Sequence, residues 1–307
     1  MKIYTALENL PEDAQGAVIA IGNFDGVHKG HQALLNAGKA RAAELGTAFG
    51  VLTFEPHPRR LFRPDEPPSR ITPAALKARR LAARHVDFLC TLTFDWDFAS
   101  QSAEAFIGSV LKGALKPAHI IVGFDFCFGQ LRKGNAQTLR QAGYEVTSIE
   151  KVTGEKGQDY SSSRIRQLLR KGNIEAANDI LGWEWEMEGP VFHGDRRGHD
   201  LGFPTANVLL GETLHPAYGV YAALVNIEGE EGWRPAATNI GIRPMFEVPE
   251  GQIEAHILDF EDRDIYGRLL RVRPVKRLRG EAKFENLEDL VTQMKTDCAQ
   301  TRSLLNT

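Results

Sequence analysis

Cysteine is scarce in this sequence, and its placement excludes two common uses of the residue. Among 307 residues there are three, Cys90, Cys127 and Cys298, which lie far apart and form no C-x-x-C pair. An odd number at such spacings predicts neither a disulfide framework nor a zinc site. We therefore expect three free thiols.

Long apolar runs and a strong excess of one charge are missing as well. No run approaches the ~20 apolar residues that a membrane span needs, and residues 1–16 carry acidic side chains where a signal peptide would be apolar. The formal net charge is −3, whereas nucleic-acid-binding proteins usually carry a basic face. We therefore predict a cytoplasmic protein with neither a membrane nor a nucleic-acid partner, and the sequence leaves self-association open.

The pattern of predicted strands and helices changes near residue 182. At roughly 100–200 residues per domain, the length favours two domains. Before residue 182, strand-like runs alternate with helical segments, which predicts an α/β domain with a doubly wound parallel sheet. After it, short β-type stretches and a helical segment at 283–304 predict a small β-barrel with a long terminal helix. We place the domains at 1–182 and 183–307.

The expected elements follow from apolar periodicity and from turn residues. One helix has a distinct start signal, because Thr72 precedes Pro73: a threonine hydroxyl commonly caps a helix, and proline is favoured at the first helical position. In the first domain we expect strands at 17–21, 47–54, 86–94 and 118–122 and helices at 31–45, 72–84, 102–114, 162–171 and 174–181; in the second, strands at 219–227, 253–260 and 268–275.

The motif G-N-F-D-G-V-H-K-G-H, at 22–31, follows the first predicted strand and opens the first helix. Ligands of open parallel sheets bind at the carboxyl ends of strands, and a helix N-terminus favours anions. His28 and His31 face one direction on a starting helix, and Gly30 leaves room for a phosphate. This arrangement suits transfer of the α-phosphoryl group of a triphosphate, which depends mainly on positioning and charge stabilisation. H-x-x-H alone would favour an ordinary helix start.

Two further segments are candidates for the same site. Residues 123–129, G-F-D-F-C-F-G, follow another predicted strand, so we expect them at the same edge of the sheet. Residues 160–166, Y-S-S-S-R-I-R, open a helix, where hydroxyls, free amides, Arg164 and Arg166 could clamp the β- and γ-phosphates. Alone, this segment is equally well explained as a capped, solvated helix start. The chain has no G-x-x-x-x-G-K-[ST] and no G-x-G-x-x-G.

A third motif, G-F-P-T-A-N at 202–207, precedes the β-rich part. Pro204 favours an extended chain, in which Thr205 and Asn207 point to the same side. Their hydroxyl and amide oxygens are the hard ligands that Mg²⁺ prefers, usually together with waters and nucleotide phosphates. From spacing alone, a polar strand face beside a turn is the simpler explanation.

Glu254 lies in the strand-like stretch I-E-A-H-I-L-D-F. On a strand it shares a face with His256, Leu258 and Phe260, so we expect it to be partly desolvated. A carboxylate in such a place could accept a proton from a substrate hydroxyl. An edge-strand glutamate that faces water is the commoner case, because glutamate is rarely buried.

Taken together, these motifs resemble a known family. G-N-F-D-G-V-H-K-G-H resembles the signature of the H-x-G-H nucleotidyltransferases, which transfer a nucleotidyl group from ATP or CTP. With F-E-P-H-P at 54–58 and the segments at 123–129 and 160–166, it is similar to the bacterial bifunctional riboflavin kinase/FAD synthetases. G-F-P-T-A-N, G-V-Y-A, N-I-G-I-R-P-M-F, E-A-H-I-L-D-F and D-I-Y-G resemble the riboflavin kinase domain of that family, so the resemblance covers nearly the whole chain.

The resemblance implies two reactions with the substrates ATP, riboflavin and FMN, and with Mg²⁺. The first domain would be an FMN adenylyltransferase that uses His28 and His31, and the second a riboflavin kinase. In the kinase, Thr205 and Asn207 would bind Mg²⁺–nucleotide, and Glu254 would activate the ribityl hydroxyl. The residues implied in ATP or flavin binding are Gly22, Asn23, Phe24, Asp25, Gly30, Asp125, Ser162, Ser163, Arg164, Arg166, Gly202, Pro204 and Asn239.

The sequence departs from the family pattern at several positions. Cys127 replaces a common Arg, His199 stands where Arg or Lys is usual, and Met245 stands where Thr is usual. Tyr160 and Ser163 differ mildly from the usual I-S-S-T-R-I-R. These changes affect the detailed contacts with substrate that the resemblance implies. They keep the hydroxyl and arginine groups on which the predicted phosphate binding depends.

Two other functions compete with this one. A tRNA-linked synthetase would share the histidine motif, but the chain has no K-M-S-K-S segment and no basic character. A non-catalytic flavin-binding protein would keep the fold and lose His28, His31, Asn207 or Glu254, and all four are present.

Overall fold

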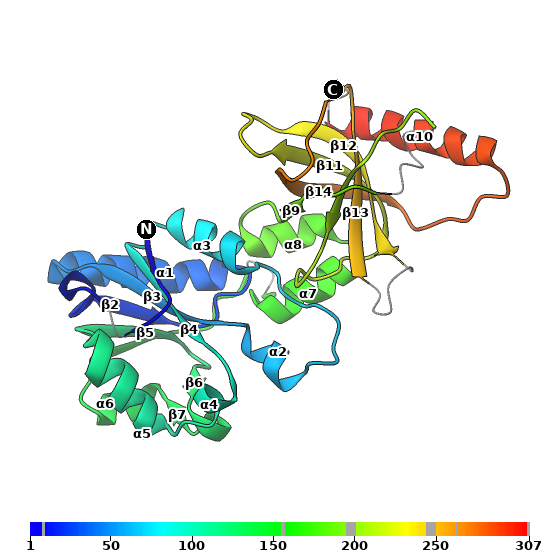
Figure 1. Cartoon of the computed structure of the whole chain (residues 1–307). Helices are drawn as coiled ribbons and strands as arrows, with labels where there is room; N and C mark the ends of the chain where they lie inside the picture. Colours follow the sequence, from blue (N-terminus) through cyan, green and yellow to red (C-terminus); the bar gives the residue numbers. More distant parts are fainter. Residues whose placement is uncertain (8–9, 155–156, 195–200, 244–249, 262, 306–307) are drawn as a thin grey trace. The chain divides into compact units, whose positions relative to one another are not determined.

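A computed structural model describes the chain except for residues 8–9, 155–156, 195–200, 244–249, 262 and 306–307 (Figure 1). The chain divides into two compact units, Met1–Glu66 with Thr72–Ser162, and Pro67–Ile71 with Ser163–Thr307. The division therefore lies before the predicted boundary at residue 182. None of the described helices has the length and apolar character that crossing a membrane requires.

The first unit is built on a parallel sheet of six strands in the order β1-β4-β3-β2-β5-β8. All neighbouring pairs in it are parallel. From β2 the chain moves outward to β3 and β4 and then returns to the other side of β2 as β5, so the sheet is doubly wound as predicted. The strands are β1 (Lys2–Tyr4), β2 (Val18–Ile21), β3 (Phe49–Glu55), β4 (Phe88–Thr93), β5 (His119–Gly123) and β8 (Val146–Ile149).

Helices cover both faces of this sheet, because its central strands are apolar on both faces. On one face, Leu34 of α1 (Lys29–Leu45) belongs to the same core as Val18 of β2. On the other, Phe106 of α5 (Ala103–Phe106) packs in a core with Ile19. The smaller elements are α2 (Pro58–Phe62), α4 (Trp96–Ala99), β6 (Cys127–Phe128), β7 (Gly134–Asn135), α6 (Ala136–Gln141) and the π-helical stretch Ile107–Leu115 that continues α5.

The helix predicted at 72–84 is α3 (Ala74–Ala82), but the cap that we predicted for it is wrong. Pro73 occupies the N-cap position, and no side chain caps the helix. The Thr72 hydroxyl is used elsewhere: it accepts a hydrogen bond from the Gly26 amide and donates one to Asp25. A buried carboxylate and a buried amide thus bind the hydroxyl that local sequence assigned to the helix.

The second unit contains an antiparallel sheet of six strands in the order β10-β13-β12-β11-β14-β9. The amide of Phe192, just after β9, donates to the carbonyl of Asn207 in β10 at 2.9 Å, which brings the two edges together into a nearly closed barrel. The helix α10 (Leu287–Leu305) packs against β11 and β12 (Figure 1). The strands are β9 (Met187–Pro190), β10 (Ala206–Leu209), β11 (Gly219–Ile227), β12 (Arg234–Arg243), β13 (Glu250–Ile257) and β14 (Leu269–Arg279).

This barrel with a long terminal helix is the fold that the sequence predicted, although β9, β10 and β12 were missed. These strands contain Gly, Pro or Asn, which are depleted in strands. The helices α7 (Ser162–Arg170) and α8 (Ile174–Leu181) were predicted at nearly these bounds.

Residues 67–71 also belong to the second unit, although they lie early in the chain. The amide of Arg70 donates to the carbonyl of Glu212, and the Leu214 amide donates to the carbonyl of Arg70. The indole of Trp185, which is fully buried, donates to the Ile71 carbonyl at 3.0 Å. The second unit therefore includes a strand-like segment from outside the predicted kinase domain, and no local pattern indicated it.

Candidate active sites

The motif 22–31 lies at the carboxyl end of β2, and residues 123–129 include the carboxyl end of β5. These two strands are hydrogen-bonded neighbours in parallel register, so the two motifs share one edge of the sheet, as predicted. The strand order reverses between them, which is where open α/β sheets bind ligands. Asp125 is exposed at this edge.

The loop that joins β2 to α1, residues 22–28, has an uncommon backbone. Its φ angles are 50° at Phe24, 90° at Gly26 and 39° at Val27. A β-branched residue at positive φ is a genuine outlier, and such conformations persist only where the surroundings hold them. The Phe24 ring is fully buried, and a Cβ on Gly22 would lie 3.3 Å from it.

His28 and His31 lie together at the start of α1, as the motif predicted. Their rings stack with centroids 3.7 Å apart, and the Nδ1 atom of His28 accepts a hydrogen bond from the His31 amide at 3.3 Å. His28 is thus the N-cap of the helix. Because Nδ1 accepts, the neutral His28 ring carries its proton on Nε2, the tautomer that can donate to a phosphate oxygen.

Gly30 lies against the His28 ring. A Cβ at this position would be 3.1 Å from that ring and 3.2 Å from the carbonyl oxygen of Tyr160. The space that we assigned to a phosphate is therefore bounded by an imidazole and a carbonyl. A side chain here would crowd the His28 ring, so the glycine favours the close approach of His28 to the helix backbone.

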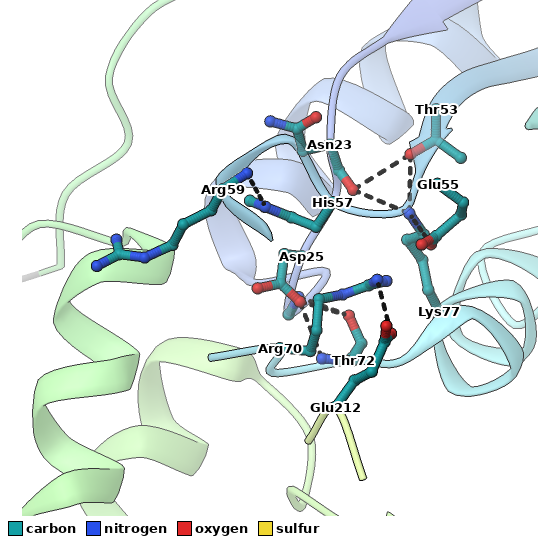
Figure 2. A network of polar contacts seen from close by, with 11 residues as sticks. Asn23, Asp25, Thr53, Glu55, His57, Arg59, Arg70, Thr72, Lys77 and Glu212 are labelled. Carbon is teal, nitrogen blue, oxygen red and sulfur yellow. Dashed lines mark hydrogen bonds and ion pairs between the residues drawn. The ribbon is translucent and has the colours of Figure 1, made fainter. Parts of the chain in front are cut away.

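The Asp25 side chain is buried, with 2% of its surface exposed. Its Oδ1 atom accepts from the Thr72 amide at 2.9 Å and from the Thr72 hydroxyl at 3.2 Å (Figure 2). Its carbonyl accepts from the Ser162 hydroxyl at 2.7 Å. Asp25 and Ser162, both predicted to bind ligand, thus hold the loop through these bonds.

The Asn23 carbonyl is held from the neighbouring strand and from α3. It accepts from the Thr53 hydroxyl at 3.2 Å and from the Lys77 ammonium at 3.3 Å, whereas the Asn23 side chain is exposed (Figure 2). The sequence showed no sign of the roles of Thr53 and Lys77, and it indicated a helix cap at Thr72. They are far from the motif in the chain, and no spacing rule links them to it.

The other residues of the predicted phosphate clamp belong to the second unit. Ser163 and Arg164 are exposed near the start of α7. Arg166 is buried, and its Nε atom donates to the Ser69 carbonyl at 2.8 Å. Their contacts with phosphate stay predictions.

In the second unit, Asn207, Glu254 and Asn239 lie side by side on β10, β13 and β12. The Asn239 amide donates to Oε2 of Glu254 at 3.3 Å, and the Gln252 amide donates to Oε1 at 3.3 Å. Gln252 also donates to Oδ1 of Asn207 at 2.8 Å. Glu254 is half-buried and belongs to a polar row across the sheet. Gln252 was not among the predicted site residues, although its spacing of two from Glu254 on a strand was a usable signal.

Two cavities of the second unit share Thr205. The first has a volume of about 430 Å³ and includes Glu254 in its lining; the second has a volume of about 500 Å³ and includes Asn207. Other residues of the first are Phe203, Asn239, His256, Phe284, Met294 and Cys298, and other residues of the second are His193, Pro204, Phe260, Arg263 and Tyr266.

The chemistry of these linings is mixed. Burial, followed by the nearby Asp297 carboxylate, raises the pKa of the Cys298 thiol, so the first cavity contains a neutral sulfur. In the second, the rings of His193 and Tyr266 lie 3.6 Å apart between centroids. The strand predicted over 253–260 ends at Ile257, so Leu258 and Phe260 do not continue the strand face of Glu254 as we expected.

The oxygen atoms of Thr205 and Asn207 fit a hard cation. Oδ1 of Asn207 accepts one hydrogen bond, from Gln252, and a carbonyl oxygen has a second lone pair. Among the described residues, no three His, Cys, Asp or Glu side chains cluster as metal ligands. Thr205 and Asn207 both line the 500 Å³ cavity, and their oxygen donors are of the kind that suits Mg²⁺, which is commonly held by one or two protein ligands and by substrate phosphates.

The remaining predicted residues lie at the entry to β10 or outside the described parts. Gly202 has a φ of 82° in a turn, and the Pro204 carbonyl lies 2.9 Å from Nδ1 of His256. His199 and Met245, two departures from the family pattern, lie outside the described residues.

Comparisons with known proteins match both parts of the chain. The family model for FAD synthetase matches residues 10–164, and the model for riboflavin kinase matches residues 181–305. The bifunctional riboflavin kinase/FMN adenylyltransferase of Escherichia coli K12 is 38% identical, with 97% of this chain and 96% of that protein covered. The protein of the same name from Bacillus subtilis is 37% identical, with 94% and 92% covered.

A solved structure has the same fold over nearly the whole length. The crystal structure of a protein from Streptococcus pneumoniae, named a macrolide-efflux protein, has a TM-score of 0.85 and 34% identity and covers 98% of each chain. That name differs from the names of the curated relatives, whereas both family models agree with the relatives.

Proposed function

The chain belongs to the bifunctional riboflavin kinase/FMN adenylyltransferase family, and from that premise we propose which of its residues carry out the two reactions. It converts riboflavin to FMN and FMN to FAD. The observation that carries the assignment of residues is that each unit holds one constellation suited to one of these steps: stacked histidines at a helix start, and a carboxylate in a polar row beside two cavities.

In the kinase, we assign riboflavin to the 430 Å³ cavity and the nucleotide to the 500 Å³ cavity. Glu254 takes the proton of the terminal ribityl hydroxyl, whose oxygen attacks the γ-phosphorus of ATP, and ADP leaves. The position of Thr205 in both linings supports this assignment, because the phosphoryl group must pass from one cavity to the other.

Asn239 and Gln252 orient the Glu254 carboxylate. Each donates to one of its two oxygens, and a carboxylate has about four lone-pair sites, so lone pairs stay available for the substrate proton. Thr205 and Asn207 would hold Mg²⁺, which when bound neutralises phosphate charge on the nucleotide.

In the adenylyltransferase, an oxygen of the FMN phosphate attacks the α-phosphorus of a second ATP, and pyrophosphate leaves. The phosphate is already ionised, so this step needs no general base, and the protein positions the groups and stabilises their charge. Nε2–H of His28, His31 and the amides at the start of α1 supply that stabilisation. Ser162, Ser163, Arg164 and Arg166 are assigned to the phosphates of the leaving group.

The test is an incubation of the protein with riboflavin, ATP and Mg²⁺, followed by chromatography of the flavins. FMN should appear first and FAD second, with one ADP and one pyrophosphate for each FAD formed. Addition of EDTA should stop the kinase step. Binding of riboflavin without conversion would show a non-catalytic flavin protein. A cytoplasmic location, the absence of nucleic-acid partners and self-association stay predictions.

A further inference from the structure

The start of α3 holds the loop 22–28 at two points. Lys77, in the first turn of this helix, binds the carbonyl of Asn23, near the beginning of the loop. Thr72, two residues before the helix, binds Asp25 and the amide of Gly26. Figure 2 shows both sets of contacts. A single short stretch of chain, 72–77, thus restrains the loop on both sides of its first positive-φ residue.

Thr72 binds the loop through both its hydroxyl and its backbone amide. Its hydroxyl accepts from Gly26 N at 2.8 Å and donates to Asp25 Oδ1, and its amide donates to the same oxygen. Thr72 is fully buried, and Asp25 nearly so. Water therefore cannot replace these bonds without opening the loop.

Lys77 is an uncommon residue for a buried position, with 2% of its side chain exposed. Its ammonium group donates to Thr53 Oγ1 at 3.0 Å, contacts the Asn23 carbonyl, and forms an ion pair with Glu55 at 2.8 Å. All three donors of the group therefore have partners. An apolar side chain would often serve stability as well as a buried ion pair does, so stability alone does not explain a lysine here.

We propose that Thr72 and Lys77 are positioning residues for adenylyl transfer, which hold the loop 22–28 in its positive-φ backbone and so set His28 and His31. The loop carries Phe24 and Val27 at positive φ, in conformations that need external support. It leads directly into His28, whose ring caps α1. A shift of the loop therefore moves the imidazoles and the first amides of α1 together.

This inference rests on the proposed assignment of the adenylyl-transfer site. Misplacement by about 1 Å of groups that position a substrate can cost on the order of 100-fold in rate. Thr72→Val removes the hydroxyl and keeps the shape of the side chain. We expect it to lower kcat for FAD formation from FMN on the order of 10- to 100-fold, with a smaller change in KM for ATP. Thr72→Ser, which keeps the hydroxyl, should restore most of the rate.

Thr147→Val is the matched control. The Thr147 hydroxyl is hydrogen-bonded to His119, which begins β5, so it lies near the amino ends of the strands, away from the edge with the motifs. Its loss should leave kcat near the wild-type value. For Lys77, the double variant Lys77→Met with Glu55→Gln removes the ion pair from both sides. Its rate should fall as for Thr72→Val, and that loss cannot come from an unpaired Glu55 charge.

Rates are expressed per folded molecule, with the folded fraction measured by near-ultraviolet circular dichroism. A kcat for Thr72→Val equal to that of Thr147→Val, or no rescue by serine, would overturn the proposal. So would a loss of folded protein with an unchanged rate per folded molecule. If Thr72→Val does not fold, the Lys77→Met/Glu55→Gln variant decides. The variant His28→Ala/His31→Ala, measured alongside, separates the two claims: full FAD formation there contradicts the site itself, whatever Thr72→Val does.

Discussion

The two candidate active sites are built by different means. In the first unit the candidate residues lie on a loop whose backbone is uncommon, and side chains distant in the sequence hold that loop from α3 and β3. In the second unit they lie on neighbouring strands in direct register, and they contact one another. The positions of side chains on paired strands follow from strand register and from the alternation of side chains along each strand. The positions of side chains on the loop depend on the hydrogen bonds that hold its backbone.

This difference predicts where each site is vulnerable. In the strand site, the residues that orient the carboxylate are its own neighbours in the sheet. In the loop site, damage can come from residues that touch no substrate. The two reactions also report separately on the loop site and the strand site, so each reaction serves as the internal control for changes in the other site.

The largest effect is expected from removal of both histidines. In His28→Ala/His31→Ala, the site loses two donors at the helix start; one preorganised donor is worth about 10²–10³-fold in kcat, so the pair should cost about 10⁴-fold or more. FAD should disappear while FMN accumulates from riboflavin in the same sample. Chromatography of the flavins measures both. Continued FAD production would remove the assignment of the N-terminal site.

The next largest effect tests the carboxylate of the strand site. Glu254→Gln keeps the shape and removes the basic oxygen, and general-base assistance typically contributes about 10²–10⁴-fold, so the kinase rate should fall by that factor. Riboflavin affinity should change far less, because the proton moves only as the hydroxyl attacks. FAD synthesis from supplied FMN should stay near wild type. If the variant kept most of its kinase rate, Glu254 would be structural.

Sequence alone predicted the parts of both sites that follow from local pattern. The buried strand before Gly22 and the helix that ends at Gly46 bracket the first motif, and both were found because apolar periodicity and glycine terminators are local signals. Thr205, Asn207 and Glu254 were predicted from strand spacing and the family resemblance, and the register places Asn207 opposite Glu254.

The remaining parts depend on contacts between distant segments. Local rules made Thr72 a helix cap, and a buried carboxylate on another segment took its hydroxyl. Nothing in the pattern of residues 67–71 showed that they would pair with residues 212–214. Likewise, nothing near Arg166 indicated its bond to the Ser69 carbonyl. Such pairings depend on tertiary structure, which overrides local propensity.

The third effect is a difference in stability between two fragments that begin at different residues near the domain boundary. We expect a fragment of residues 183–307 to fold and to phosphorylate riboflavin. A fragment of residues 163–307 should be more stable, because α8 packs against β14 and buries Ile174, Ile180 and Leu181. Full burial of one such side chain is worth about 1.5–3 kcal/mol, so the difference should be several kcal/mol.

Urea unfolding of the two fragments, with kinase rates of each, measures this difference. Both fragments lack the Ile71 carbonyl that binds the Trp185 indole, so that loss cancels between them. Equal stability would place α7 and α8 outside the kinase core. Fragments that are insoluble with every boundary shifted by several residues would count against an independent kinase domain.

The smallest effect is expected from substitution of Gln252. This substitution tests whether neighbouring side chains of the sheet support Asn207 and Glu254. Gln252 is 7% exposed and donates to both Asn207 and Glu254, so it links the proposed metal ligand to the proposed base. Gln252→Met keeps a similar length and removes both hydrogen bonds. Loss of such a supporting contact typically costs about 10–100-fold, and we expect the lower end because Asn239 still orients Glu254.

The double variant Gln252→Met with Asn239→Leu sharpens this test. If the two amides share the task of orienting Glu254, the combined loss of kinase rate should exceed the product of the single losses, because either amide alone still holds one carboxylate oxygen. The adenylyltransferase rate of each variant, measured with supplied FMN, should stay at the wild-type value. A Gln252→Met kinase with an unchanged rate and an unchanged Mg²⁺ dependence would show that strand register alone positions Asn207 and Glu254. The strand site would then need no supporting side chain at Gln252, whereas the loop site would still depend on the side chains that hold it.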